Sequence, residues 1–288
     1  MTQQIPPGQE IVEISPESFA FFAEFITREL GIKMSDAKLP MLQSRLLRRL
    51  RALQLSSLDE YRRYLADSPD SEEERIHFIS AVTTNKTDFF REPQHYDYLV
   101  NSALPKLYPE TASAPGARIT AWSAGCSSGE EPYTLAMVLN EYCQKRPRFD
   151  FAILATDISN RVLQQAAAGT YEESRIEPVP QSLRAKYLLR SRDRSAQLVR
   201  VVPDLRQKVS FHCLNFMDRD YRIRAMFDVI FFRNVMIYFD RPTQEAVVNR
   251  MCRYLRPGGY LFVGHSESLT GLNIPVTSVT TAILRKQS

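Results

Sequence analysis

The pattern of apolar and polar positions divides the chain into two regions that differ in secondary structure. Up to residue 92, apolar residues recur at helical spacing, without any strand pattern. From Ala117 onward, short apolar runs such as ARITAW, FDFAILATD and FDVIFFRN alternate with helical segments. This alternation is typical of a mostly parallel sheet with crossover helices. We therefore predict an all-helical N-terminal domain over residues 1–92 and a doubly wound α/β domain over residues 93–288.

The helical region has a strongly basic segment. Its first helix is predicted to be capped by Ser15 or Ser18 and to end at Gly31, and two later helices lie around SSLDEYRRYLAD and DSEEERIHFISAVTT. Between the first helix and these two, residues 39–55 form a predicted amphipathic helix. Its apolar side carries Leu42, Leu46, Leu50 and Leu53, and its other side carries Arg45, Arg48, Arg49 and Arg51. A solvated face is the usual explanation for such charges, but acidic partner helices or nucleic acid would also fit.

Two departures from the alternation are predicted in the second region. Between residues 171 and 208, the strand-like runs KYLLR and QLVRV flank a polar turn, which predicts an inserted β-hairpin subdomain. The C-terminal VTSVTTAILRK alternates in strand fashion and predicts one antiparallel edge strand.

Composition narrows the class of protein. The 288 residues, of which 44% are apolar, are enough for two modest domains. Neither a bilayer-spanning apolar run nor a secretion signal is present, so we expect a cytoplasmic protein without membrane insertion. The four cysteines and four histidines lack metal-ligand spacing, so we expect neither disulfides nor a metal. The net charge of +4 is too small to indicate nucleic-acid binding by itself.

The most informative motif is SAGCSSGEEPY, which follows the first predicted strand. A glycine turn at this place allows a cofactor to approach the backbone. Gly125 and Gly129 do not have the G-x-G-x-x-G spacing of dinucleotide sites, and Glu130 and Glu131 would repel a pyrophosphate. A cationic nucleoside without phosphates, such as S-adenosylmethionine, fits better, unless both glutamates merely favour the helix N-terminus. Asp157, at the end of FDFAILATD, is suited to bind ribose hydroxyls or to cap the next helix.

Several motifs together resemble one family, the CheR-type chemotaxis receptor methyltransferases. They are TTNKTDFFRE, SAGCSSGEEPY, ATDIS, FFRNVMIYFDRPTQ and PGGYLFVGHSES, and their order is that of the family over nearly the whole chain. The resemblance implies a methyltransferase sheet joined to a helical domain. It also implies transfer of a methyl group from S-adenosylmethionine to glutamate side chains on the cytoplasmic helices of chemoreceptors. The arginine face would then bind these helices rather than nucleic acid, and we expect a monomer.

The resemblance also implies roles for individual residues. The cofactor-binding residues that it implies are Asn85, Thr87, Arg91, Glu131, Asp157, Asn215, Phe216, Arg233 and Asn234. Tyr238 and Arg233 would orient the substrate carboxylate and the methyl donor. As simpler explanations, Asn85 and Thr87 could cap a helix that begins near Asp88, and Tyr238 could be a core residue.

Three further positions have a structural explanation. Asn215 and Phe216 follow a strand and could simply start a turn. His265 in GHSES is expected to make a structural hydrogen bond, and Cys126 to fill the glycine turn. No general base is required, because the reference pKa of glutamate, about 4.3, leaves the nucleophile ionised at neutral pH.

Two partners and two rival functions stay open. Some members of the family bind a pentapeptide of the receptor C-terminal tail with the inserted hairpin, but here its turn reads SRDRSAQ, without the glycines that accompany tail binding. An RNA methyltransferase on the same sheet and a non-catalytic S-adenosylmethionine sensor are the rival functions.

Overall fold

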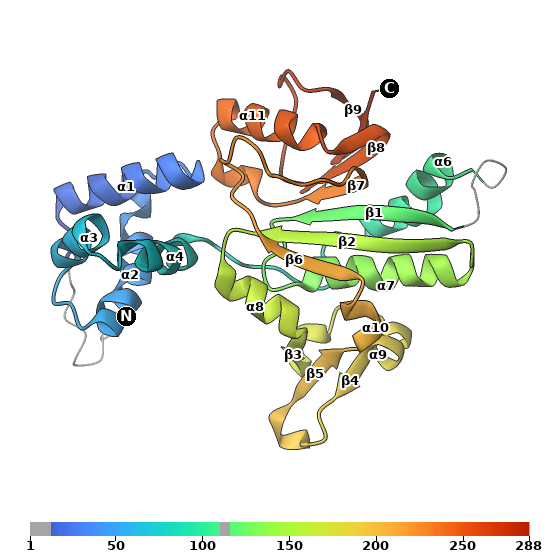
Figure 1. Ribbon diagram of the computed structural model, residues 1–288, viewed down its shortest axis with the longest axis horizontal. Coiled ribbons are helices and arrows are strands. Elements are labelled where there is room, and N and C mark those ends of the chain that lie inside the picture. Colours follow the sequence, from blue (N-terminus) through green and yellow to red (C-terminus); the bar gives the residue numbers. More distant parts are fainter. Residues whose placement is uncertain (1–12, 110–115, 288) are drawn as a thin grey trace, which may run out of the picture. The chain divides into compact units, whose positions relative to one another are not determined.

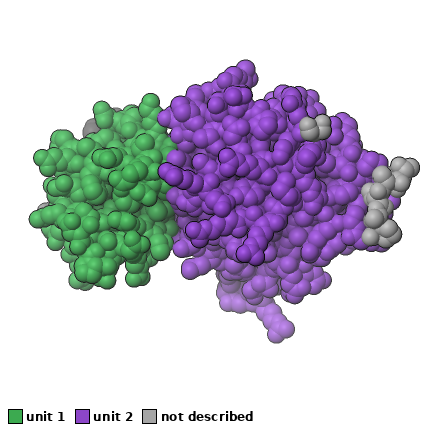
Figure 2. All heavy atoms as spheres, turned by 45° about the horizontal axis from the view of Figure 1, so that its top comes forward, with its two compact units in different colours: residues 1–84 green, residues 85–288 purple. Residues whose placement is uncertain are grey.

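The computed structural model describes residues 13–109 and 116–287 (Figure 1). The chain forms two compact units, Met1–Thr84 and Asn85–Ser288 (Figure 2). This division lies before the predicted boundary at residue 92. Residues 85–92 belong to the second unit because Ser127 Oγ donates a hydrogen bond of 2.9 Å to the Asn85 carbonyl, and Phe90 N donates one of 3.2 Å to Thr134 Oγ1.

The described part of the first unit is helical, as predicted. Ser15 is the N-cap of the first helix, and Gly31 ends it in the left-handed conformation at φ 67°. Leu42, Leu46 and Leu50 are buried against the other helices, whereas Leu53 is only half-buried. The helices are α1 (Pro16–Leu30), α2 (Leu39–Leu53), α3 (Leu58–Asp67) and α4 (Ser71–Val82), with a 3₁₀ turn at Asp36–Lys38.

A seven-stranded sheet organises the second unit, in the order β6-β2-β1-β7-β8-β10-β9. The pairs from β6 to β8 are parallel, and β10 is antiparallel to both β8 and β9. The strands are β1 (Ala117–Ala124), β2 (Phe149–Asp157), β6 (Val209–Cys213), β7 (Phe227–Phe232), β8 (Leu255–Val263), β9 (Val276–Thr280) and β10 (Ile283–Lys286). The single predicted edge strand at the C-terminus is therefore wrong. Ala282, at φ 61°, lies in a turn that folds the segment into two paired strands.

Helices pack against the sheet, and the strand order locates its switch point. Helices α7 and α8 pack against β2 and β6 (Figure 1), and α11 packs against β8. Because β1 lies between β2 and β7, the strand order reverses there, and in doubly wound sheets ligands bind at the carboxyl ends of the strands at such a point. The helices are α5 (Gln94–Tyr98), α6 (Leu104–Leu107), α7 (Glu130–Gln144), α8 (Asn160–Ala168), α9 (Gln181–Tyr187), α10 (Pro203–Arg206) and α11 (Arg241–Cys252), with a π-helical turn at Leu99–Ala103.

The inserted subdomain is larger than the predicted hairpin. It is a three-stranded antiparallel sheet in the order β3-β5-β4, with β3 at Thr170–Glu172, β4 at Leu188–Arg190 and β5 at Leu198–Val201. The predicted hairpin corresponds to β4 and β5. Strand β3 has only three residues, too few for a period-2 pattern to reveal it.

Candidate functional site

The turn between β1 and α7 is held tightly to its neighbours. The amides of Gly125 and Cys126 both donate to the Thr156 carbonyl, at 2.8 and 2.9 Å. Gly129 has φ 98°, and a Cβ there would lie 2.8 Å from the Tyr171 hydroxyl, so no other residue fits this turn. Cys126 is fully buried within the turn, as a filler of the turn should be.

Asp157, at the end of β2, holds two loops together. Its Oδ2 accepts a hydrogen bond of 2.9 Å from Ser127 N, and its Oδ1 accepts one of 3.0 Å from Ser159 N. Burial raises the pKa of Asp157. Ser159 is the N-cap of α8, so Asp157 binds the amide of the cap residue rather than an amide within the helix. Since the Ser127 hydroxyl binds the Asn85 carbonyl, Asn85 and Asp157 adjoin the same turn.

Glu130 in the first turn of α7 is buried. Only 1% of it is exposed; Ser128 Oγ donates to it at 2.7 Å, and Arg175 forms an ion pair with it. Burial is the main cause that raises the pKa of Glu130. Arg175 also donates to the Thr87 carbonyl at 3.0 Å, which attaches the Thr87 segment to the turn. No helix begins near Asp88, where capping by Asn85 or Thr87 was the alternative, because α5 starts at Gln94.

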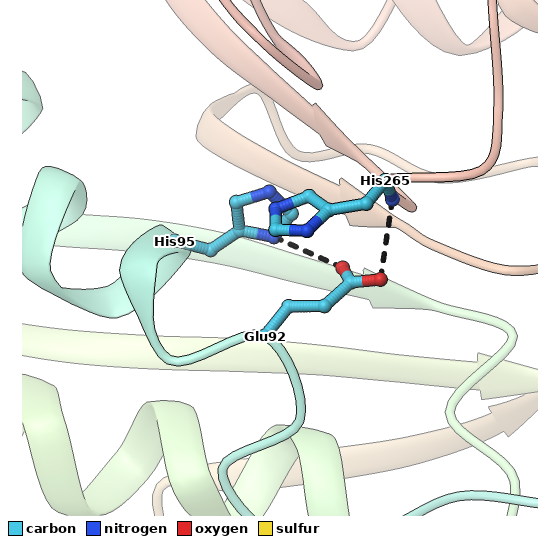
Figure 3. A group of neighbouring side chains, drawn as sticks. All are labelled: Glu92, His95 and His265. Carbon is cyan, nitrogen blue, oxygen red and sulfur yellow. Dashed lines mark hydrogen bonds and ion pairs between the residues drawn. The ribbon is translucent and has the colours of Figure 1, made fainter.

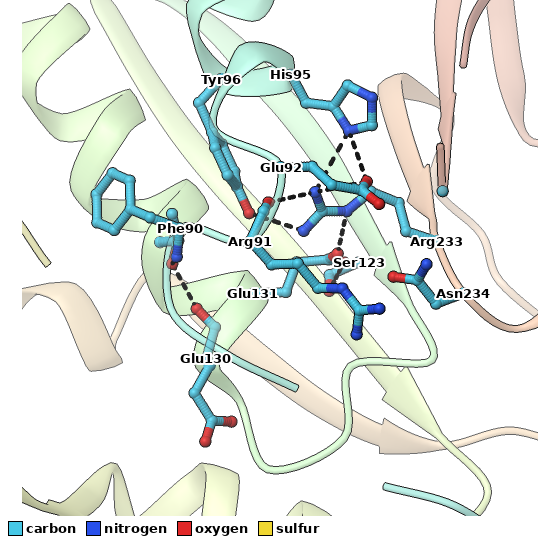
Figure 4. Close-up of polar contacts among 12 residues, drawn as sticks. Phe90, Arg91, Glu92, His95, Tyr96, Ser123, Glu130, Glu131, Arg233 and Asn234 are labelled. Atoms are coloured by element: carbon cyan, nitrogen blue, oxygen red, sulfur yellow. Dashed lines mark hydrogen bonds and ion pairs between the residues drawn. The ribbon is translucent and has the colours of Figure 1, made fainter. Parts of the chain in front are cut away.

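Arg233, at the end of β7, joins Glu131 to the segment that precedes α5 (Figure 4). Its Nε donates to Glu131 Oε2 at 2.7 Å, and Ser123 Oγ donates to the other Glu131 oxygen at 2.7 Å. Its Nη1 donates to the Arg91 carbonyl at 2.6 Å, and its Nη2 donates to the Tyr96 hydroxyl at 3.0 Å. Arg233 is 6% exposed, so its charge is largely used within the protein.

The turn after Arg233 carries two more of the predicted residues. Asn234 has φ 59°, and Glu267 accepts hydrogen bonds from the amides of Asn234 (2.9 Å), Gly264 (2.6 Å) and Met236 (2.8 Å). Burial raises the pKa of Glu267. Tyr238 ends the 3₁₀ turn that begins at Met236 and is half-buried rather than a core residue. Its hydroxyl makes no hydrogen bond to any other residue in the described part of the chain.

Phe216 lies beside the glycine turn. A Cβ at Gly125 would be 2.6 Å from Val235 Cγ2 and 3.9 Å from the Phe216 ring, and that ring packs edge-on against Phe232 with 4.9 Å between centroids. Asn215 Oδ1 accepts a hydrogen bond of 2.9 Å from Met217 N. Asn215 therefore starts a turn, as the structural alternative in the sequence analysis had it.

A group of three polar side chains at this edge was not predicted (Figure 3). His95 Nδ1 lies 3.4 Å from Glu92 Oε2, and His265 N donates to Glu92 Oε1 at 3.2 Å. The His265 ring packs edge-on against His95 with 4.8 Å between centroids. These side chains offer metal-ligand atoms, but Arg233 Nη1 lies 3.3 Å from His95 Nδ1 and 3.4 Å from Glu92 Oε2, and its charge would repel a metal cation.

Strained backbone gathers at this site. Four residues other than glycine have positive φ here: Phe90, Glu92, Ser127 and Asn234. Such conformations cost about 1–3 kcal/mol each and persist where the surroundings impose them. Together with the hydrogen bonds of Asp157 and Glu267, they indicate a site whose shape is fixed in advance.

The four arginines of α2 have different surroundings. Arg49 makes a two-pronged ion pair with the buried Glu74, with Nε and Nη2 at 2.9 and 2.5 Å from its oxygens. Arg45 donates to the Val82 carbonyl and, at 2.7 Å, to Thr84 Oγ1. Of the four, only Arg48 and Arg51 are exposed, so the outward basic face is narrower than the helical spacing suggested.

The donor set at the switch point suits a nucleoside without phosphates. Glu130 and Glu131 already lie in the first turn of α7, each paired with an arginine, so the dipole of this helix N-terminus is complemented without a phosphate. Asp157 retains lone pairs for hydroxyl donors, because each of its oxygens accepts one hydrogen bond from the loops. These residues fit the ribose and cationic groups of S-adenosylmethionine.

Among the described residues, no helix combines the length and the apolar composition needed to cross a bilayer.

Residues 85–283 match the family described as CheR methyltransferase, SAM binding domain, and residues 17–83 match CheR methyltransferase, all-alpha domain. The chain is 40% identical to the chemotaxis protein methyltransferase of Borreliella burgdorferi over 90% of this chain and 91% of that protein. It is 37% identical to the chemotaxis protein methyltransferase of Salmonella typhimurium, over 94% and 93% of the two chains, respectively. The chain therefore belongs to the CheR family of S-adenosylmethionine-dependent chemotaxis methyltransferases.

Proposed function

We propose that this protein transfers a methyl group from S-adenosylmethionine to glutamate side chains on the cytoplasmic helices of chemoreceptors, forming methyl esters. The observation that carries the proposal is the set of three buried carboxylates at the glycine turn, called the carboxylate ring below: Glu130, Glu131 and Asp157, of which Asp157 forms no ion pair within the described residues. It favours a cationic nucleoside over a phosphorylated one. Membership of the CheR family supports the receptor as the substrate.

The proposed reaction needs positioning more than acid–base chemistry. S-adenosylmethionine, when bound, supplies an electrophilic methyl group on a positively charged sulfur. The glutamate carboxylate, with a reference pKa of about 4.3, is ionised at neutral pH and needs no base. Good alignment of the reacting atoms can lower the activation barrier by roughly 7–11 kcal/mol.

Within this proposal, Tyr238 orients the substrate and Arg233 has a different role. The Tyr238 hydroxyl has no partner among the described residues, and its turn is fixed by Glu267, so it is a neutral donor available to a carboxylate. The guanidinium of Arg233 is bound to Glu131, Tyr96 and the Arg91 carbonyl. Arg233 is therefore a positioning residue. This assignment also avoids a strong charge clamp on the carboxylate, which would stabilise the ground state as much as the transition state.

Two surfaces are proposed to bind the receptor. Arg48 and Arg51 point into solvent from α2 and suit acidic receptor helices. In the inserted subdomain, Leu189 is 53% and Leu198 is 36% exposed, which offers apolar contacts to a receptor tail peptide. The turn between their strands lacks the glycines that accompany tail binding in the family. Calorimetry with a C-terminal pentapeptide of the receptor tests whether this tail binds.

The test of the proposed function uses radiolabelled S-adenosylmethionine and membranes that contain chemoreceptors. We expect label on the receptor band that mild base releases, as it does from a carboxyl methyl ester. Tyr238→Phe should slow labelling, and a heat-denatured sample serves as the control. Base-stable label or label on RNA would contradict the proposal, and cofactor binding without any transfer would favour a sensor.

A further inference from the structure

One face of the sheet lacks the helix that a doubly wound fold usually has there. Helices α7 and α8 pack against β2 and β6 on one side (Figure 1). The chain then returns from β6 to β7 through residues 214–226, which contain no helix. Tyr221 of this segment packs edge-on against Trp122 of β1, with 5.9 Å between ring centroids. The return segment therefore lies over β1, and among the described residues no helix covers the same face of β2 and β6.

A groove of about 1200 Å³ occupies this place. Its floor includes Ala152 and Leu154 of β2 and Ser210 and His212 of β6, and residues 218–225 form its wall. Ser210 and His212 are exposed, and Ala152 and Leu154 are half-buried. We call this hollow the β2–β6 groove. It lies along the sheet face and combines small, apolar and polar floor residues.

The wall of the groove carries more positive than negative charge. Arg219, Arg222 and Arg224 line it, are exposed and form no ion pair within the described residues. Two carboxylates also lie in the wall: Asp218 is exposed, and Asp220 is bound by the Tyr254 hydroxyl at 2.9 Å and by the Arg222 amide at 3.0 Å. Three arginines against two carboxylates leave the wall with a net charge of +1. Ile223, which is half-buried, and Ala225, which is exposed, add apolar surface to the same wall. A ligand for this wall should therefore combine acidic with apolar groups.

The dimensions of the groove suit a short helix. A helix about 10 Å in diameter that fills this volume would be about 15 Å long, or roughly ten residues. The crossover of a doubly wound sheet normally supplies an element of this kind at this place. A phosphorylated small molecule fits less well, because the floor is open and includes the apolar residues Ala152 and Leu154.

We propose that the β2–β6 groove binds an acidic amphipathic helix of a partner protein, which completes the missing helical layer. Carboxylates of the partner would face Arg219, Arg222 and Arg224, and its apolar side chains would cover Ala152 and Leu154. This inference is independent of the methylated substrate, because it concerns binding at a surface apart from the carboxylate ring.

The test measures binding of a labelled helical peptide to the full chain by fluorescence anisotropy. The probe has about 14 residues, with leucines on one face and glutamates on the other, and a matched peptide has lysines instead of the glutamates. The acidic peptide should bind and the lysine peptide should not. The double variant Arg222→Glu/Arg224→Glu should weaken binding by about tenfold, and Ser210→Trp should reduce it by filling the floor.

The control variant is Lys145→Glu, an exposed lysine at the end of α7. It should leave peptide binding unchanged, and all variants should keep wild-type affinity for S-adenosylhomocysteine and the wild-type melting curve. Equal binding of both peptides, no binding of the acidic peptide, or equal effects of the groove and control variants would overturn the proposal. Complete displacement of the peptide by sodium pyrophosphate would likewise overturn it, in favour of a phosphate-binding site.

Discussion

Nε of Arg233 donates a 2.7 Å hydrogen bond to Oε2 of Glu131, and both side chains are buried. The pair joins the end of β7 to the start of α7. Removal of one partner leaves the other charge buried without compensation, which costs about 3–5 kcal/mol. Arg233→Met should therefore lower the free energy of unfolding by about this amount in urea titrations, together with the affinity for S-adenosylhomocysteine.

A matched variant is Arg256→Met. Arg256 Nη1 lies 2.6 Å from Asp228 Oδ1, but 43% of the Arg256 side chain is exposed, and Thr120 also binds Asp228 through its amide and hydroxyl. We expect this variant to lower the free energy of unfolding by about 1 kcal/mol or less, because solvent screens the ion pair. Similar losses of unfolding free energy in the two variants would contradict the structural importance assigned to Arg233.

Stability should depend on pH through His95. Burial, and then the charge of Arg233, lower the pKa of His95 to about 4. The unfolded chain takes up a proton near pH 6.5, whereas the folded chain does not, so stability falls as the pH falls from 6.5 towards 4. Between pH 7 and pH 5 the loss due to this residue should be about 2 kcal/mol.

His95→Gln isolates this contribution. Glu130, Asp157 and Glu267 act in the opposite sense, because burial raises their pKa values and their protonation therefore favours the folded state. The quantity to compare is the change in unfolding free energy between pH 7 and pH 5, in wild type and in variant. An unchanged pH dependence would show that His95 does not titrate as inferred.

Tyr238→Phe should affect turnover rather than cofactor binding. The variant removes one hydroxyl that has no partner within the described residues. Loss of a single hydrogen bond to the substrate carboxylate should slow transfer by about fivefold to tenfold. Single-turnover methylation and calorimetry with S-adenosylhomocysteine separate the two effects, and reduced cofactor affinity with normal transfer would refute the assignment.

The arginines of α2 should divide into two classes. Arg48→Glu/Arg51→Glu should reduce methylation of receptor fragments and leave the melting curve and cofactor affinity unchanged, because both side chains are exposed. Arg49→Glu should instead destabilise the helical unit, since it places a second carboxylate beside the buried Glu74. Circular dichroism melting distinguishes the classes; normal methylation by the double variant would place the receptor contact elsewhere.

Local signals made much of the fold and part of the site predictable. The glycine turn, the strand end at Asp157 and the capping serine Ser15 depend on neighbours within a few residues, and the structure places them where the pattern indicated. The helical spacing of α2 also located its apolar side. It did not reveal that Arg49 is bound, because the partner Glu74 comes from α4.

Residues that act across the sheet could not be predicted from such signals. Glu267 follows β8 and binds the amide of Asn234, 33 positions earlier in the sequence, after β7. Glu92 lies 141 positions before Arg233. The first pair exists because the parallel strands β7 and β8 end at the same edge, and the second because the segment before α5 lies against that edge. No short-range pattern encodes which side chains meet there. The motifs that contain Glu92 and Glu267 could be recognised in the sequence, but the partners of these residues could be identified only from the folded structure.

The attachment of residues 85–92 to the second unit limits how this protein can be recombined. The Arg91 carbonyl accepts from Arg233, and the Asn85 carbonyl accepts from Ser127, so this segment is part of the structure around the glycine turn as well as a connection. A fragment that starts at Pro93 would leave those donors unpaired. Any fusion that gives this methyltransferase a new recognition domain must therefore join before Asn85.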